Sequence, residues 1–383
     1  LTVYDKDGTE QVMIAKYVEI QYLPSPGIDR IGGFDYKNNG IYWFADGAVA
    51  EVIAPDGYGI SKSLNGDYTG SVSLSQSDAK TVYLKRVSDG AMTDAIDLSD
   101  RLKWDTTAPE GTVKLPSGNF WTQLVKKNSF RFFFKDAKSI TITAQDNDSG
   151  VKSIQYFYSF EDLINVSSLN TADAIAKLET AIGDDWEDYN GPFALEQDGK
   201  YIVYAKITDN VGSVTYISSD GIVIYSDATS SNANITTTYK AGEDREISVE
   251  LNGNTVNEVT CDDALLAATD YTVSDGKITL KAEYLDTLAA GEYTVAISVN
   301  PMGCSYEDYD INDKPLDLVI ILTVNPKPVT VPTADTEDYV YDGSEHTYDI
   351  PDSEDYTVTG NHHTNAGTYT VTVSLKDKAN TVW

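Results

Sequence analysis

The chain has 383 residues and a formal net charge of −32, from 28 Lys and Arg against 60 Asp and Glu. This length exceeds one β-sandwich of roughly 100 residues, and the charge argues against nucleic acid or anionic membrane surfaces as partners, because phosphate groups bind cationic faces. No stretch of the sequence approaches the roughly 18 apolar residues of a membrane span, so we expect no membrane insertion.

One short pattern recurs along the chain: glycine, any residue, tyrosine, then a strand that alternates apolar and small polar residues. It occurs at Gly199–Tyr201, Gly291–Tyr293 and Gly367–Tyr369. A period of two with one apolar face predicts half-buried strands. A tyrosine at the start of such a strand is typical of the tyrosine corner of immunoglobulin-like (Ig-like) sandwiches. The recurrence therefore predicts an all-β chain of tandem Ig-like modules.

Proline and small polar residues mark the expected boundaries between modules. We expect four Ig-like modules, at residues 1–104, 105–227, 228–325 and 326–383. The last is short for a sandwich of roughly 100 residues, and we expect it to be C-terminally truncated.

The second module carries the one helix that the sequence predicts, at residues 171–182. Ala174, Ile175, Leu178 and Ile182 form an apolar stripe at helical spacing, and Gly183 ends it. We expect this short helical insertion to be the exception in a chain of strands and turns.

Three segments resemble known bacterial modules. Asp105–Pro109, with residues 142–156 and 204–212, resembles the Ig-like repeats of secreted proteins from Gram-positive gut bacteria. Residues 271–295 resemble the Ig-like module attached to cellulases and cellulosome scaffolds, and the motifs at 341–343 and 356–371 resemble the mostly-β repeats of large surface proteins. These resemblances imply display, spacing, adhesion or glycan attachment rather than chemistry.

Four aspartates of the second module are predicted to converge. Asp146 and Asp148 follow a strand that we interpret as strand B, Asp209 follows strand F, and Asp105 begins strand A at the same end of the sandwich. Carboxylates suit Ca²⁺, so one interpretation is a calcium site at the junction of the first two modules. The other is that the carboxylates accept backbone N–H groups and stiffen turns, since the full ligand pattern of a calcium loop is absent. We expect no other cofactor.

Cys261 and Cys304 both fall in the third module. They either form a disulfide, as an oxidising exterior allows, or remain two buried thiols. The sequence does not separate these alternatives.

Aromatic residues supply the candidate sugar contacts. Trp121, Trp186, Tyr189, Tyr156 and Tyr158 gather in the second module, and Trp186 and Tyr189, together with Trp121, are our predicted ligand-binding residues. The competing interpretation is that they fill the core or pair across strands. Tyr306 and Tyr309 form a second group in the third module.

We find no nucleophile or paired-histidine metal motif in the sequence and expect no enzyme. The primary hypothesis is a non-catalytic bacterial protein, secreted or attached to the cell wall, that serves adhesion or spacing and binds a host or cell-wall glycan or a surface protein. The alternative is a glycan-binding accessory region of a larger carbohydrate-active enzyme.

Overall fold

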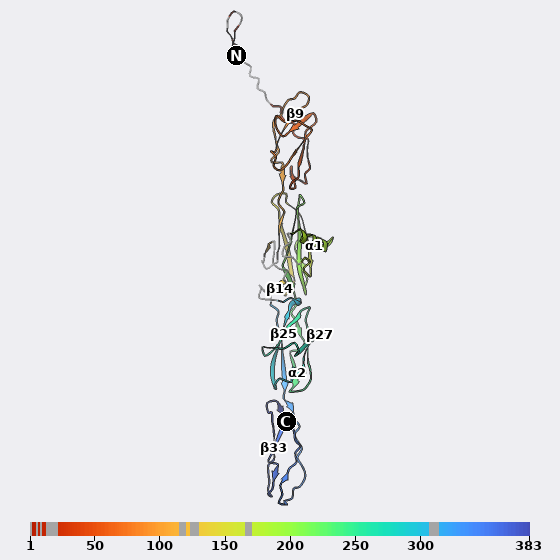
Figure 1. Cartoon of the computed structure of the whole chain (residues 1–383), viewed down its shortest axis with the longest axis vertical. Helices are drawn as coiled ribbons and strands as arrows, with labels where there is room; N and C mark the ends of the chain where they lie inside the picture. The colour runs from red at the N-terminus through yellow and green to blue at the C-terminus, as the bar shows by residue number, and fades with distance from the viewer. Residues whose placement is uncertain are drawn as a thin grey trace.

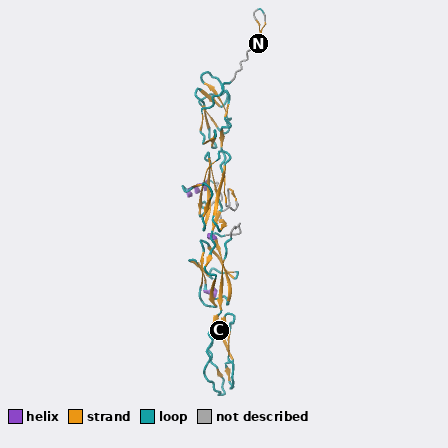
Figure 2. Cartoon of the chain, turned by 180° about the vertical axis from the view of Figure 1, so that it is seen from behind, coloured by secondary structure: helices purple, strands orange, loops and turns teal. Residues whose placement is uncertain are grey.

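The computed structural model describes residues 2–4, 7, 10–12, 22–114, 120–122, 130–164, 171–305 and 314–383. The described chain is almost entirely β, and its modules follow one another along one long axis (Figure 1). Figure 2 shows the same rod from behind, with strands running along the axis and loops gathered where modules meet. The prediction of an all-β chain of tandem sandwiches is confirmed. No helix among the described residues is long and apolar enough to cross a membrane.

The first module contains three small three-stranded sheets, with orders β10-β9-β7, β11-β5-β4 and β3-β6-β8, and the pair β1-β2. Its strands are β1 (Thr2–Tyr4), β2 (Glu10–Val12), β3 (Arg30–Gly32), β4 (Tyr36–Asn38), β5 (Ile41–Phe44), β6 (Ala50–Ile53), β7 (Tyr58–Ser61), β8 (Ser71–Leu74), β9 (Thr81–Arg86), β10 (Ile96–Asp97) and β11 (Leu102–Trp104). Residues of β3, β5, β6, β7, β8, β9 and β11 enclose one core that includes Phe44, Ile60 and Leu84.

The second module is a two-sheet sandwich, with orders β13-β12-β15-β18 and β14-β21-β19-β16-β17, and β20 paired to β19. Its elements are β12 (Glu110–Lys114), β13 (Phe120–Thr122), β14 (Phe130–Phe134), β15 (Lys138–Gln145), β16 (Val151–Ser159), α1 (Ala172–Ile182), β17 (Glu187–Asp188), β18 (Phe193–Leu195), β19 (Gly199–Asp209), β20 (Val214–Ser218) and β21 (Gly221–Ile224).

Helix α1 is the helix that the sequence predicts. Thr171 caps its first turn by accepting the N–H of Ala174, and Gly183 follows its last residue with a positive φ. Its stripe covers the outer face of the second sheet, where Leu178 and Ile182 pack against Ile202 and Tyr204.

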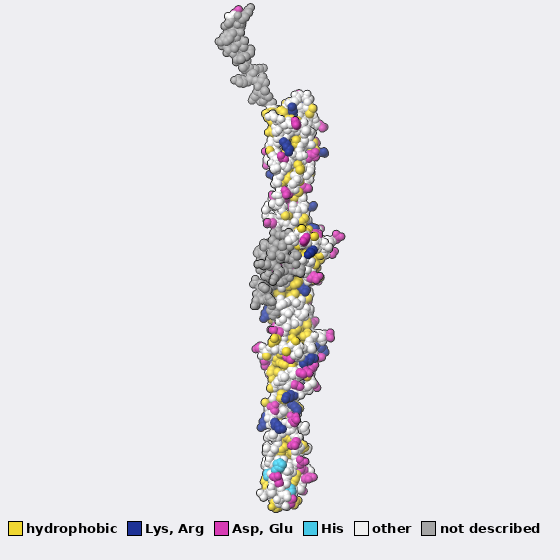
Figure 3. Space-filling model, in the orientation of Figure 1, with side chains coloured by type: hydrophobic (Ala, Val, Ile, Leu, Met, Phe, Trp, Pro, Cys, Tyr) yellow, Lys and Arg dark blue, Asp and Glu magenta, His cyan; other side chains and the backbone are white. Residues whose placement is uncertain are grey.

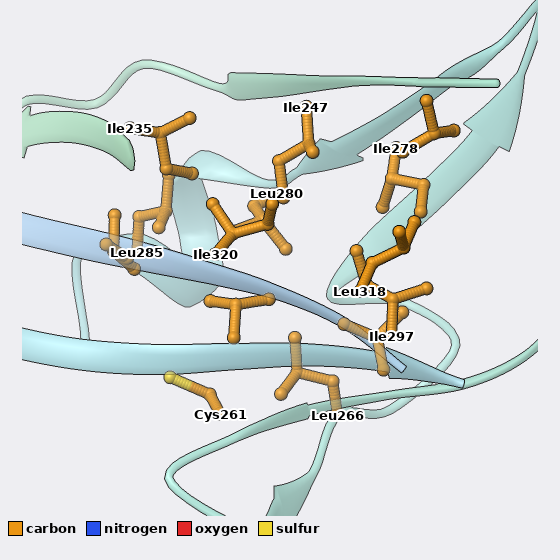
Figure 4. Close-up of a cluster of buried hydrophobic side chains, with 14 of the residues drawn as sticks. Ile235, Ile247, Cys261, Leu266, Ile278, Leu280, Leu285, Ile297, Leu318 and Ile320 are labelled. Carbon is orange, nitrogen blue, oxygen red and sulfur yellow. The ribbon is translucent and has the colours of Figure 1, made fainter. Parts of the chain in front are cut away.

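The third module is also a two-sheet sandwich, with orders β22-β24-β28-β27 and β23-β30-β29-β25-β26. Its elements are β22 (Thr229–Ser230), β23 (Asn234–Thr238), β24 (Arg245–Glu250), β25 (Thr255–Cys261), β26 (Ala264–Leu265), β27 (Tyr271–Ser274), β28 (Lys277–Leu280), α2 (Ala282–Leu285), β29 (Gly291–Asn300), a 3₁₀ turn (Pro301–Gly303) and β30 (Leu318–Asn325). The expectation of a single helix is wrong, because α2 adds one short turn whose Leu285 reaches the core. Both sheets contribute to that core, for example through Ile247 and Ile297 (Figure 4).

The fourth module contains three two-stranded pairs, β31-β36, β32-β34 and β33-β35. Its strands are β31 (Lys327–Pro328), β32 (His346–Thr347), β33 (Tyr356–Thr359), β34 (His362–His363), β35 (Thr372–Leu375) and β36 (Thr381–Val382). The expected buried face of the strand after Gly367 is only half-buried, and Tyr369 is 44% exposed. In the described structure β35 pairs with β33 alone, so its other edge has no partner strand among the described residues.

All three predicted tyrosine corners are present. The hydroxyl of Tyr201 donates to the carbonyl of Glu196 at 3.2 Å, that of Tyr293 to Ala289 at 3.0 Å, and that of Tyr369 to Asn365 at 2.7 Å. Each bond ties the start of a strand to the chain a few residues upstream, as in Ig-like domains.

Candidate functional site

Three carboxylates meet where the first module joins the second. Asp105 follows β11, Asp146 follows β15 and Asp209 ends β19, and one oxygen of each lies within 4.8 Å of the others. Asp105 and Asp209 are completely buried, and Asp146 is half-buried. Asp148 is exposed and instead accepts the hydroxyl of Thr107 at 3.1 Å. The structure therefore brings together three of the four predicted aspartates.

Each of these three carboxylates also accepts backbone N–H groups. Asp105 accepts the N–H groups of Thr107 and Ser149 through different oxygens. Oδ1 of Asp146 accepts two such bonds from its own loop, and Oδ1 of Asp209 accepts three, at 2.7–3.0 Å. Turn capping is therefore present, but it occupies only one oxygen each of Asp146 and Asp209.

The remaining polar atoms of this junction are less well satisfied. Oδ2 of Asp209 and Oγ of Ser149 are buried without a hydrogen-bond partner. Burial raises the pKa of the Asp146 carboxyl; the N–H of Gly150 opposes that rise, and repulsion from Asp105 and Asp209 adds to it. Two unit charges at this separation repel by roughly 3 kcal/mol at an effective dielectric constant of about 20. The junction thus concentrates negative charge. None of the ion pairs among the described residues includes one of these three aspartates.

The predicted sugar-binding pair, Trp186 and Tyr189, does not form one platform. Trp186 is half-buried and packs with α1 and the ring of Tyr216, whose centroid lies 6.2 Å away. Tyr189 packs on the opposite side, against the sandwich core, and its hydroxyl accepts the N–H of Ile142 at 3.0 Å. The two residues flank β17 and lie three positions apart. Successive residues of an extended chain point to opposite faces, so an odd separation makes their rings diverge. The side chain of Trp121 lies outside the described residues, as do Tyr306 and Tyr309.

A different aromatic group reaches solvent at the edge of the second module. Tyr156 and Tyr158 of β16, with Phe160 just beyond it, line up at alternate positions and meet Phe193 of β18 and Tyr201 of β19. We call these five residues the edge cluster. Phe160 is 60% exposed, Tyr158 is 37% exposed and Tyr201 is buried. Sequence reasoning missed Phe160 and Phe193, although the spacing 156, 158, 160 is a signal for one strand face.

The two cysteines do not pair. Both are free and buried, so the disulfide interpretation is wrong and the buried-thiol interpretation holds. Cys261 lies opposite Val295 in the register of β25 and β29, and belongs to the third module's core (Figure 4). Cys304 lies beyond the far end of β29, past Asn300. Asn300 is five positions beyond Val295 along the strand, which is roughly 17 Å, and a disulfide needs Cα atoms within about 7 Å.

The fourth module contains an open cleft of about 810 Å³, lined by aliphatic, small polar and aromatic residues; the aromatic ones include Tyr348, Tyr369 and Trp383. The adjacent histidines do not share a partner: His362 bonds the hydroxyl of Thr347, whereas His363 bonds the carbonyl of Gly360.

One part of the chain matches a known family. Residues 228–302, within the third module, match the family model described as carbohydrate binding domain X2. This confirms the predicted likeness of the third module to modules of bacterial cellulases and cellulosome proteins. No curated protein matches the chain.

Solved structures with similar parts are multi-domain proteins. A trimodular GH5_4 endoglucanase is 19% identical, over 32% of this chain and 20% of its own, with a TM-score of 0.22. A trimodular GH5 endo-β-1,4-glucanase from Bacillus licheniformis is 14% identical, over 59% of this chain and 45% of its own, with a TM-score of 0.26. Fibronectin(III)-like modules of CbhA from Clostridium thermocellum are 10% identical, over 55% of this chain and 93% of their own, with a TM-score of 0.19. The chain thus spans less than half the length of either glucanase.

Proposed function

We propose that this chain is a non-catalytic, extracellular, carbohydrate-binding accessory region, in which the third module contacts a polysaccharide. The match of residues 228–302 to a carbohydrate binding domain carries the proposal. That segment has no tryptophan in its sequence, and its tyrosines at 239, 271, 284 and 293 are only partly buried. Contact there would rest on tyrosine edges and polar groups.

The negative charge of the chain favours a neutral glycan over an anionic one. The net charge is −32, and carboxylates appear on every module with Lys and Arg scattered between them (Figure 3). A surface of this sign repels polyanions. We therefore propose a neutral polysaccharide, such as a β-glucan, as the ligand.

The edge cluster offers a second contact for the same polymer. Aromatic rings that are rigid and partly exposed give large contact area at a low cost in entropy, and they suit the apolar C–H faces of pyranose rings. Phe160 and Tyr158 have this exposure. Tyr158 lies parallel to the ring of Phe193, and Phe160 contacts the ring of Tyr201 at a tilt, which holds both rings in place. The proposal thus uses the second module as well as the third.

The test uses the intact chain and a glycan array, followed by hydrogen-exchange mass spectrometry with any glycan that binds. Protection of peptides within 228–302 is the expected result. Protection confined to residues 156–160, or to the cleft of the fourth module, would contradict the assignment to the third module. Absence of binding to every neutral glycan on the array would contradict carbohydrate binding itself.

A spacing role is the second candidate, and contacts at the junction of the second and third modules favour it. Phe133, Val223, Tyr225, Met302 and Cys304, contributed by both modules, form one shared apolar cluster. Polar contacts surround it: side chains of Asn252 and Asn254 donate to the carbonyls of residues 227 and 226, and Lys135 pairs with Asp227 at 2.7 Å. Such a junction resists bending, which suits a chain that holds binding modules at a fixed distance.

A further inference from the structure

The aspartate cluster between the first two modules has the dimensions of a single-ion site. Ca²⁺ binds oxygen ligands at about 2.3–2.6 Å, so two ligands of one ion lie at most roughly 5 Å apart. One carboxylate oxygen from each of Asp105, Asp146 and Asp209 lies within 4.8 Å of the other two. One ion can therefore contact all three without a large movement of the backbone.

An independent observation points to a ligand at this place. Asp209 is completely buried, and its Oδ1 accepts three backbone N–H groups, yet its Oδ2 has no partner. Buried polar atoms are almost always hydrogen-bonded, and a buried charge without a partner is costly. Turn capping explains Oδ1 of Asp209 and leaves Oδ2 unexplained. Nearby, Ser149 Oγ is also buried without a partner.

The donor set favours a hard divalent cation. The three ligands are carboxylates, and no histidine or cysteine lies in the first or second module, which argues against zinc or copper. Mg²⁺ requires near-octahedral geometry at about 2.0–2.1 Å, whereas Ca²⁺ accepts longer and less regular arrangements.

We propose that Asp105, Asp146 and Asp209 bind one calcium ion at the junction of the first two modules. Asp105 follows the last strand of the first module, whereas Asp146 follows β15 and Asp209 ends β19 in the second. The ion ties the connecting segment to the loops of the second module, and so fixes the direction in which the first module projects. This inference does not depend on carbohydrate binding.

The test is a calcium titration of the intact chain after metal removal with EDTA, by calorimetry and by Tb³⁺ luminescence sensitised through Trp104, the neighbour of Asp105 in sequence. We expect one site per chain and a rise in melting temperature with calcium, because an ion that binds only the folded state stabilises it. No binding heat, no sensitised luminescence and no thermal shift at about 5 mM calcium would overturn the proposal. Binding of Mg²⁺ with equal affinity would overturn the assignment to calcium.

Matched variants separate metal binding from turn capping. Asp146→Asn and Asp209→Asn keep an oxygen that accepts the backbone N–H groups but remove the charge. We expect each variant to lower the affinity for calcium at least about tenfold. Asp198→Asn is the control: Asp198 also accepts a backbone N–H, that of Ser226 at 2.6 Å, and its φ of 58° suits asparagine. It should leave calcium affinity unchanged. Wild-type affinity in both cluster variants would overturn the proposal, and circular dichroism of each variant checks the fold.

Discussion

The backbone N–H of Ser149 donates to Oδ2 of Asp105 at 3.0 Å, although 44 residues separate them. Both are buried, and Asp105 begins the segment that leaves the first module. Asp105→Ala should therefore leave the Ser149 N–H buried without a partner and lower the free energy of unfolding of the second module by roughly 2 kcal/mol. Urea unfolding, followed by fluorescence at no added calcium, measures this loss. An unchanged midpoint would mean that this bond does not stabilise the junction.

The apolar cluster between the second and third modules should stiffen the rod. Met302→Ala removes a half-buried side chain from this cluster, and we expect a loss of roughly 1–2 kcal/mol, below that of a fully buried methionine. Small-angle X-ray scattering should show a shorter maximum dimension, and limited proteolysis should cut faster within residues 226–232. Val319→Ala is the control, since Val319 is 57% exposed on β30. Identical scattering and cleavage in both variants would show that the cluster does not hold the modules in line.

Phe160 should contribute to glycan binding without contributing to the fold. Because it is 60% exposed, Phe160→Ala should change the free energy of unfolding by less than about 0.5 kcal/mol. Loss of one aromatic contact should weaken binding of the glycan found on the array roughly two- to tenfold. Val87→Ala, which removes a 74% exposed side chain from the first module, is the control. Equal affinity of the two variants would exclude the edge cluster from the binding surface.

Both cysteines should be free thiols of low reactivity. Burial raises the pKa of the Cys261 thiol and that of the Cys304 thiol, so little thiolate forms at neutral pH. We expect slow reaction with Ellman's reagent in the folded chain, two fast equivalents in guanidinium, and a melting temperature unaffected by reductant. Fewer than two thiols in the unfolded, unreduced chain would contradict this.

The first module should lose stability in acid through a turn around Asp78. The N–H of Ser75, then its hydroxyl and the ammonium of Lys62, lower the pKa of Asp78 from 3.8 to about 2. Since the folded pKa is the lower one, this contribution is complete above about pH 4 and is lost as the pH falls through about 2. Melting curves between pH 5 and pH 2 should therefore decline less steeply for Asp78→Asn. Asp46→Asn, in another exposed loop, is the control, and equal slopes for wild type and Asp78→Asn would contradict the prediction.

Features that depend on a few neighbouring residues were predictable from the sequence. The tyrosine corners at Tyr201, Tyr293 and Tyr369 each close over four or five residues, so glycine, spacing and alternation suffice to locate them. The same holds for α1, whose cap, apolar stripe and terminal glycine lie within one segment. Asp146 and Asp209 could be placed at one end of the sandwich because the loops that follow strands B and F lie at the same end of an Ig-like fold.

Only the tertiary structure decided which side chains share a surface. Trp186 and Tyr189 are close in sequence, but the strand between them turns their rings to opposite sides. Phe160, which follows β16, instead contacts Tyr201 on the neighbouring strand β19. Cys261 and Cys304 lie in one module, yet Cys261 on β25 faces Val295 in the middle of β29, whereas Cys304 lies beyond the end of that strand. Asp209, whose Oδ2 is buried without a partner, meets Asp105 and Asp146, which are distant in the sequence. Such relationships depend on strand register and packing between sheets, which join residues far apart in the chain and which local pattern does not encode.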